Sequence, residues 1–192
     1  MKTPVCAVFD VGKTNKKLLL FDGDYRIMRE TAESFDEISD DEGFHGDDLP
    51  RLITWLQTSL HALLTGGQFD VRAVNVATYG ASFVHIDAAG QAVTPLYNYL
   101  KPFPRQLHEH FYGQRGGCDP FCVETASPDI GMLNSGLQLY WLKHTQPARF
   151  GQITHSLHLP QFCSYLFTQT PVADLTSVGC HTGLWHFARH RY

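Results

Sequence analysis

The sequence has no long apolar run, no excess of basic residues and no regular cysteine framework. No apolar stretch approaches the roughly 20 residues that a membrane-spanning helix requires, so we expect no membrane partner. Acidic residues outnumber basic ones by 19 to 15, and no basic stripe appears, which argues against nucleic-acid binding. The first residues, 1–4, lack the apolar core of a signal peptide and lead directly into a strand pattern. We therefore expect a cytoplasmic protein.

The cysteines and histidines also fit no metal pattern. The five cysteines are irregularly spaced, and an odd number without a signal peptide predicts reduced thiols. Cys118 and Cys122 are four residues apart, but no second pair completes a zinc site. The eleven histidines include no motif such as H-E-x-x-H. The sequence thus predicts no zinc centre.

The hydrophobic pattern predicts a folded α/β domain. Hydrophobic residues make up 43% of the 192 residues and charged residues 18%, as is usual for a globular protein. Residues 5–10, 16–22 and 25–35 read as three consecutive strands joined by turns, and residues 71–78 and 82–87 as further strands. Residues 135–144 and 159–167 read as helices, whereas residues 106–134 show no clear pattern. This order predicts a mixed sheet flanked by helices.

The clearest helix pattern follows an acidic loop at residues 36–48. Asp47 or Asp48 is placed to cap the helix, and Gly66-Gly67 to end it. Leucine and isoleucine recur there at spacings of three and four, which predicts one apolar helix face: Leu49, Leu52, Ile53, Leu56, Leu60, Leu63 and Leu64.

The segment between the first two strands carries the chemistry. Gly12 allows close backbone approach to an anion. Lys13, Thr14, Asn15 and Lys17 can donate hydrogen bonds or positive charge to phosphate oxygens. Asp10, at the end of a strand, can hold a hydrated Mg²⁺. The segment is therefore a candidate phosphate-binding hairpin.

Two other interpretations of this segment stay open on the residues alone. Gly12-Lys13-Thr14 also matches the end of a P-loop, but a P-loop needs a glycine five residues before Gly12, where Ala7 stands. A P-loop also leads into a helix, whereas residues 17–21 read as a strand. The second alternative is an ordinary polar turn with no ligand.

The pattern Asp-x-Gly-x-Thr-x-x-Lys of Asp10–Lys17, near the N-terminus and followed by a strand and a hairpin, resembles the first phosphate motif of the FGGY carbohydrate kinases. Lys13 replaces the usual threonine of that motif. Residues 77–90 resemble the family's sugar loop, with Tyr79 in place of the common histidine. Residues 95–101 lie where the family often has Trp-x-Asp-x-Arg, and residues 136–150 and 173–185 loosely match later segments.

The resemblance implies the ribonuclease H-like fold of actin-like ATPases, with a mixed sheet flanked by helices. It implies ATP and Mg²⁺ as cofactors and a sugar or polyol as substrate. Gly12, Lys13, Thr14, Asn15 and Lys17 would contact phosphate, and Asp10 the metal through water. The substrate-binding residues would be Thr78, Tyr79, Gly80, Tyr97, Asn98 and Lys101.

The resemblance covers nearly the whole chain but only the amino-terminal lobe of such a kinase. We expect residues 1–192 to form that lobe incompletely, with the nucleotide lobe absent. The general-base aspartate is expected beyond residue 192, so this chain alone is expected to be inactive. A homodimer is one oligomeric state that the sequence allows.

Two other functions remain open. One is a non-catalytic module that uses the same fold to bind a sugar or phosphate, and the other is an ATPase of the actin-like group. The sugar-loop segment disfavours the second, because such ATPases bind no hydroxyl substrate there. The kinase interpretation requires that the Gly12 bend face the region of residues 78–101, not the domain interior.

Overall fold

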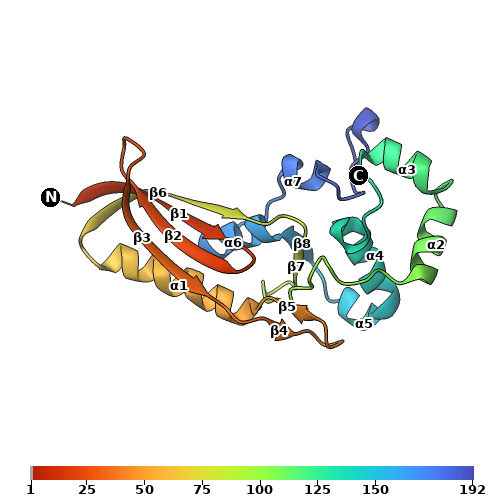
Figure 1. The fold of residues 1–192 in the computed structure, drawn as a ribbon, viewed down its shortest axis with the longest axis horizontal. Coiled ribbons are helices and arrows are strands. Elements are labelled where there is room, and N and C mark those ends of the chain that lie inside the picture. Colours follow the sequence, from red (N-terminus) through yellow and green to blue (C-terminus); the bar gives the residue numbers. More distant parts are fainter. Residues whose placement is uncertain (1) are drawn as a thin grey trace.

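The computed structural model describes residues 2–192 and contains a four-stranded mixed sheet in the order β3-β2-β1-β6. Strands β1 (Thr3–Val11), β2 (Asn15–Phe21) and β3 (Ile27–Ser34) form an antiparallel meander, and β6 (Phe69–Thr78) pairs with β1 in parallel. The three predicted strands and the strand after the long helix are confirmed. The sheet and α1 lie at one end of the molecule's long axis, and α2–α5 at the other (Figure 1).

Helix α1 (Leu49–Thr65) covers one face of this sheet together with α6 (Leu159–Thr168). Asp48 caps α1 by accepting a hydrogen bond from the backbone N–H of Arg51, and Gly66 ends it, as the sequence predicted. Leu52 and Leu56 are fully buried in the core, but Leu64 is 54% exposed. The prediction that Leu64 belongs to the buried face was therefore wrong, because Leu64 lies on the solvent side of α1 while the neighbouring Leu63 packs into the core.

Alternation along the strands divides the sheet into a covered and an open face. Val5, Ala7, Phe9 and Val11 of β1 are buried under the helices, whereas Asp10 is exposed. In β2 the same alternation buries Lys16 with Leu18 and Leu20. Neighbouring polar residues of one strand consequently serve opposite faces of the sheet.

The remaining elements build a second, mostly helical part. β7 (Phe83–Ile86) pairs antiparallel with β8 (His155–His158), and β4 (Ile38–Ser39) pairs with β5 (His45–Gly46). The helices are α2 (Arg105–Gly113), α3 (Cys118–Thr125), α4 (Ser135–Thr145), α5 (Pro147–Phe150) and α7 (Leu175–Gly179), with short 3-10 turns at Gly131–Leu133 and Phe187–Arg189.

The sequence predicted α4 and α6 but not α2, α3, β5 or β8. Helix α3 has no apolar stripe at helical spacing, and β8 is only four residues long. All five cysteines are free thiols, in agreement with the sequence prediction. In the described part of the chain, none of the helices is both long and apolar enough to span a bilayer.

Two leucines of α1 give a matched test of this packing. Leu56→Ala should lower the free energy of unfolding by about 2–5 kcal/mol, because it leaves a cavity between α1 and the sheet. Leu64→Ala should change it by less than about 0.5 kcal/mol, because the side chain is exposed. Urea unfolding of both variants measures the difference, and equal losses would contradict the assigned core.

Candidate functional site

The predicted phosphate and sugar segments meet where β1 and β6 end. The parallel register places Val11 opposite Thr78, so the bend at residues 12–14 and the loop at residues 79–81 leave neighbouring strand ends. In open α/β sheets, ligands bind outside the carboxyl ends of the strands. The arrangement therefore puts both candidate segments at the edge where a ligand site is expected.

Gly12 is required by the tightness of the bend. Its N–H donates to the carbonyl of Asn15 over 3.0 Å. A Cβ at this position would lie 2.9 Å from the same carbonyl oxygen. Asn15 is also fixed, because its Oδ1 accepts a hydrogen bond from Ser34 Oγ of β3. Thr14, at the tip of the bend, is exposed.

The P-loop alternative is wrong for this bend. The residues after it form β2, a strand and not a helix. Lys17 lies on the open face and pairs with Glu30 over 2.8 Å, a hydrogen bond that raises the pKa of Lys17. Asp10 lies opposite Lys17 in the register of β1 and β2.

A buried carboxylate, Asp47, lies beneath the bend. Its Oδ2 accepts hydrogen bonds from Lys13 Nζ and from the Tyr79 hydroxyl, each over 2.7 Å, and its Oδ1 accepts from Lys16 Nζ over 3.0 Å. Asp47 is only 8% exposed. Burial acts to raise the pKa of this carboxyl, but the hydrogen bonds from Lys13, Tyr79 and Lys16 outweigh it and hold the pKa below its ordinary value.

Lys16 is the most deeply buried charged side chain of this group, at 1% exposure. Its ammonium donates to Asp47 and, over 2.9 Å, to the backbone carbonyl of Lys13. It also lies 5.2 Å from the centre of the Phe35 ring. A lysine without a partner in this position would be very costly, so Asp47 is required for it.

Lys13 connects the bend to the sugar loop. Its ammonium lies 5.5 Å from the ring centre of Tyr79 and 5.8 Å from that of Tyr99, within cation–π range. The two rings are themselves 5.8 Å apart. Burial and the Asp47 carboxylate raise the pKa of Tyr79, so its hydroxyl remains a proton donor at neutral pH. The bend thus faces the region of residues 78–101, as the kinase interpretation requires.

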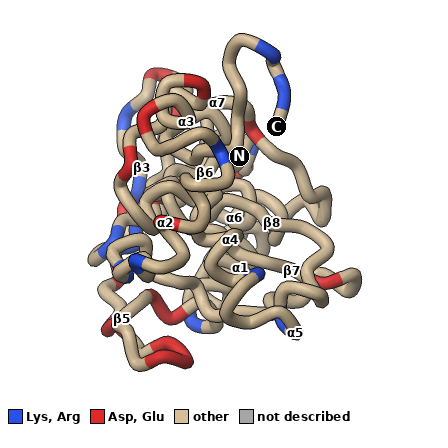
Figure 2. The backbone as a smooth tube through the Cα atoms, turned by 90° about the vertical axis from the view of Figure 1, so that its right-hand side faces the viewer, with Lys and Arg blue, Asp and Glu red and all other residues tan. Residues whose placement is uncertain are grey.

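A second buried ammonium, Lys101, is also held by the acidic loop. It donates to Asp40 over 2.5 Å and lies 2.9 Å from Glu42. The rings of Tyr97 and Trp141 flank it, each centred 5.1 Å away. In Figure 2 the backbone beside β5 carries this acidic stretch in red.

Tyr97 and Asn98, two other predicted sugar contacts, have structural partners as well. The Tyr97 hydroxyl donates to Asp41 over 3.2 Å, and Asn98 Nδ2 donates to the carbonyl of His45 over 2.9 Å. Tyr97, Asn98 and Lys101 are each less than 8% exposed. Sugar contacts from these three side chains therefore stay predictions.

A pocket of about 330 Å³ adjoins Thr78 and Gly80. Its other polar lining comes from Ser135 on α4, from Thr176 and Ser177 on α7, and from Cys180 and His181. Asp174 caps α7 by accepting a hydrogen bond from the Ser177 N–H. Hydroxyl and imidazole groups suit a polyhydroxylated ligand, and a pocket of this size falls within the range of small-molecule sites.

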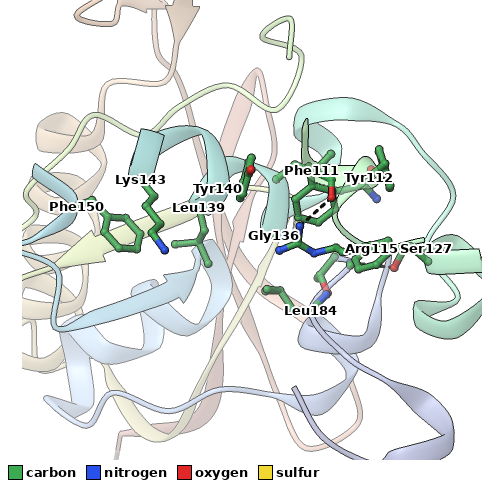
Figure 3. Close-up of a pocket in the computed structure, with 15 residues that line it drawn as sticks. Phe111, Tyr112, Arg115, Ser127, Gly136, Leu139, Tyr140, Lys143, Phe150 and Leu184 are labelled. Atoms are coloured by element: carbon green, nitrogen blue, oxygen red, sulfur yellow. Dashed lines mark hydrogen bonds between the residues drawn. The ribbon is translucent and has the colours of Figure 1, made fainter. Parts of the chain in front are cut away.

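Another pocket, of about 250 Å³, lies between α2, α3 and α4 and is shown in Figure 3. Its walls include the rings of Phe111, Tyr112 and Tyr140, and Arg115 donates from its guanidinium to the carbonyl of Phe111. None of the predicted site residues lines this pocket. It is therefore separate from the candidate site at the ends of β1 and β6.

The metal prediction rests on Asp10 alone. Its exposed carboxylate at the end of β1, beside the bend, suits a magnesium ion bound through water. Over residues 2–192, no three His, Cys, Asp or Glu side chains gather closely enough to bind a metal ion directly. The donor set fits a hydrated ion that ligand phosphates would complete.

Asp47 and Lys16 are the functional candidates that the sequence reasoning missed. A signal for Lys16 was present, because it alternates with Leu18 and Leu20 and therefore falls on the covered face. Asp47 was considered only as a helix cap, a role that Asp48 fills. No local pattern distinguishes the buried aspartate from its neighbour.

The comparisons with known proteins agree with this architecture. A family model described as "FGGY family of carbohydrate kinases, N-terminal domain" matches residues 5–186. The comparison with curated proteins gives no match. Among solved structures, a carbohydrate kinase from Novosphingobium aromaticivorans is 27% identical with a TM-score of 0.80, over 97% of this chain and 38% of that one.

Two more distant structures show the same fold. A xylulose kinase from Lactobacillus acidophilus is 16% identical with a TM-score of 0.82, over 98% of this chain and 38% of its own. A Plasmodium falciparum glycerol kinase, solved with ADP, is 12% identical with a TM-score of 0.76, over 100% of this chain and 39% of its own. The predicted actin-like fold class is confirmed, and the chain spans well under half the length of these structures.

The lowered pKa of Asp47 predicts how stability depends on pH. A carboxyl whose pKa is lower in the folded than in the unfolded chain stabilises the fold above its unfolded pKa and loses this contribution as the pH falls through the folded pKa. The melting temperature of the wild type should therefore drop below about pH 4. The double variant Lys16→Met/Asp47→Asn lacks both the carboxylate and the buried ammonium. Its melting temperature should fall less steeply over the same pH range. Parallel curves from thermal unfolding between about pH 3 and pH 6 would contradict the assigned role of Asp47.

Proposed function

Because the chain belongs to the FGGY family of carbohydrate kinases and matches the N-terminal domain of that family, we propose that it is the amino-terminal part of an ATP-dependent kinase that phosphorylates a hydroxyl of a ketose or polyol. The observation that carries the proposal is the contact of the Gly12 bend with the sugar loop, through Lys13 and the rings of Tyr79 and Tyr99. This contact supports the proposal because the candidate phosphate hairpin and the candidate sugar loop lie at one edge of the sheet.

Each predicted site residue has a role in this proposal. Gly12 keeps the bend tight enough for the terminal phosphates of ATP to approach the backbone. The side chains of Lys13, Thr14, Asn15 and Lys17 bind these phosphates. Asp10 would hold Mg²⁺ through water, and the ion would offset phosphate charge. The pocket beside Thr78 and Gly80 receives the sugar or polyol.

The transferred group is the γ-phosphoryl of ATP. The bond from the γ-phosphorus to its bridging oxygen breaks, a bond from phosphorus to the substrate hydroxyl oxygen forms, and the hydroxyl proton passes to a general base. The pocket beside Thr78 is lined by hydroxyl, imidazole, thiol and apolar groups and by no carboxylate. We place the general base outside residues 1–192, since the chain spans only 38% of the carbohydrate kinase that it resembles. Phosphoryl transfer depends on positioning and charge stabilisation from both lobes, so the chain alone binds its ligands without turnover.

Phosphate binding is tested on this chain by calorimetric titration with magnesium tripolyphosphate and with MgATP. Lys13→Met should weaken tripolyphosphate binding about tenfold or more, because it removes a cation from the bend. Lys143→Met is the matched control, since it removes the same charge from an exposed position on α4 that faces the other pocket. Equal effects of the two variants, or no binding by the wild type, would overturn the phosphate assignment.

Sugar binding is tested by thermal shift with a panel of ketoses and polyols. A ligand that binds only the folded chain raises its melting temperature. At a ligand concentration of 100 times the dissociation constant, the free energy of unfolding rises by about 2.7 kcal/mol. Ser177→Leu should abolish the shift by filling the pocket while leaving tripolyphosphate binding intact. Rapid ADP release by this chain with ATP and any panel member would contradict the assignment of the general base beyond residue 192. Ligand binding here, combined with a complete kinase sequence that shows no turnover, would favour a non-catalytic binding module.

A further inference from the structure

Asp47 joins three segments that the proposed function needs. Its side chain accepts from Lys13 and Lys16 of the hairpin and from Tyr79 of the sugar loop. Its backbone forms an antiparallel bridge with Leu96, at the start of the segment that leads to Tyr99. Segments about 30 or more residues apart in sequence therefore meet at one carboxylate.

We propose that Asp47 is a positioning residue for the kinase reaction, which fixes the phosphate hairpin relative to the sugar loop. The inference rests on the proposed function and adds a residue to it. In this role Asp47 binds no ligand itself, because its oxygens accept from Lys13, Lys16 and Tyr79. It acts through Lys13 and Lys16.

Two routes run from Asp47 to the bend. The direct route is its hydrogen bond to the ammonium of Lys13, which lies against the rings of Tyr79 and Tyr99. The indirect route passes through Lys16, whose ammonium binds both Asp47 and the carbonyl of Lys13. The Asp47 carboxylate therefore restrains both the side chain of Lys13, directly, and the backbone of Lys13, through Lys16. Misplacement of a contact by about 1 Å can cost a hundredfold in rate, so such restraint matters for catalysis.

A purely structural role is the competing explanation, since Asp47 also neutralises a buried lysine. The two explanations differ in what they predict for ligand binding. A structural role lowers stability alone, whereas a positioning role also weakens anion binding at the bend. Net charge must be held constant in this comparison, because anion affinity follows local charge as well.

The chain offers a variant that holds this charge constant. Asp47→Asn alone leaves the Lys16 ammonium buried without a carboxylate, which commonly costs several kcal/mol and threatens folding. Lys16→Met/Asp47→Asn removes one positive and one negative charge together, and the methionine fills the space of the lysine stem. The net charge of the cluster stays the same, while Lys13 loses its ion pair with the Asp47 carboxylate. Glu37, whose carboxylate lies 4.0 Å from Lys13, is retained in both proteins.

The experiment is calorimetric titration of the double variant and the wild type with magnesium tripolyphosphate. We expect the double variant to bind about tenfold more weakly, although its net charge is unchanged. A second readout is the lysine ammonium signal in ¹H–¹⁵N spectra, where the Lys13 resonance, assigned from Lys13→Met, should be lost in the double variant. Unchanged affinity with a cooperative melting transition would overturn the proposal.

A second variant keeps the proposal testable if the double variant does not fold. Asp47→Glu retains the charge and lengthens the side chain by one methylene, which displaces Lys13. It should bind tripolyphosphate several-fold more weakly at an unchanged net charge, and wild-type affinity would count against positioning.

The outcomes also separate this proposal from the proposed function. If Lys13→Met weakens tripolyphosphate binding but neither Asp47 variant does, the phosphate-binding role of the hairpin is supported and the positioning role of Asp47 is contradicted. If the wild type binds no tripolyphosphate, both the proposed phosphate binding and the positioning role of Asp47 are contradicted.

Discussion

The hydrogen bonds of the buried Asp47 carboxylate hold the candidate site together. Three donors from two distant segments converge on it, namely the ammonium groups of Lys13 and Lys16 and the hydroxyl of Tyr79. Burying a charge is costly unless it is paired and hydrogen-bonded, so the group is stable only as a complete set. The geometry of the Gly12 bend and the orientation of Tyr79 therefore depend on one another through this residue.

The alternation of β2 determines which lysine takes part. Successive side chains of a strand point to opposite faces, so Lys16 goes under the helices and Lys17 to the open face. Lys16 stabilises the backbone of the bend from below, while Lys17 and Asp10 stand on the side that solvent and a ligand can reach. One short strand thus supplies both the support of the site and its exposed charges.

The acidic loop at residues 36–48 has more functions than connecting β3 to α1. Asp40 holds Lys101, Asp41 accepts from Tyr97, and Asp47 holds Lys13. Each carboxylate fixes a side chain that the family resemblance assigned to ligand binding. The loop is therefore a layer that supports the hairpin and the sugar loop together.

The sequence by itself determined the strand meander, α1 with its Asp48 cap, and the glycine bend, because periodicity, capping and tight turns are local properties. It also carried the family pattern that the comparisons confirm. Only the tertiary structure decided that Asp47, and not Asp48, is the buried partner of the bend, and that Lys101 and Tyr97 are occupied by Asp40 and Asp41. These contacts join residues more than 30 positions apart, and no local pattern encodes which distant carboxylate a buried ammonium will meet.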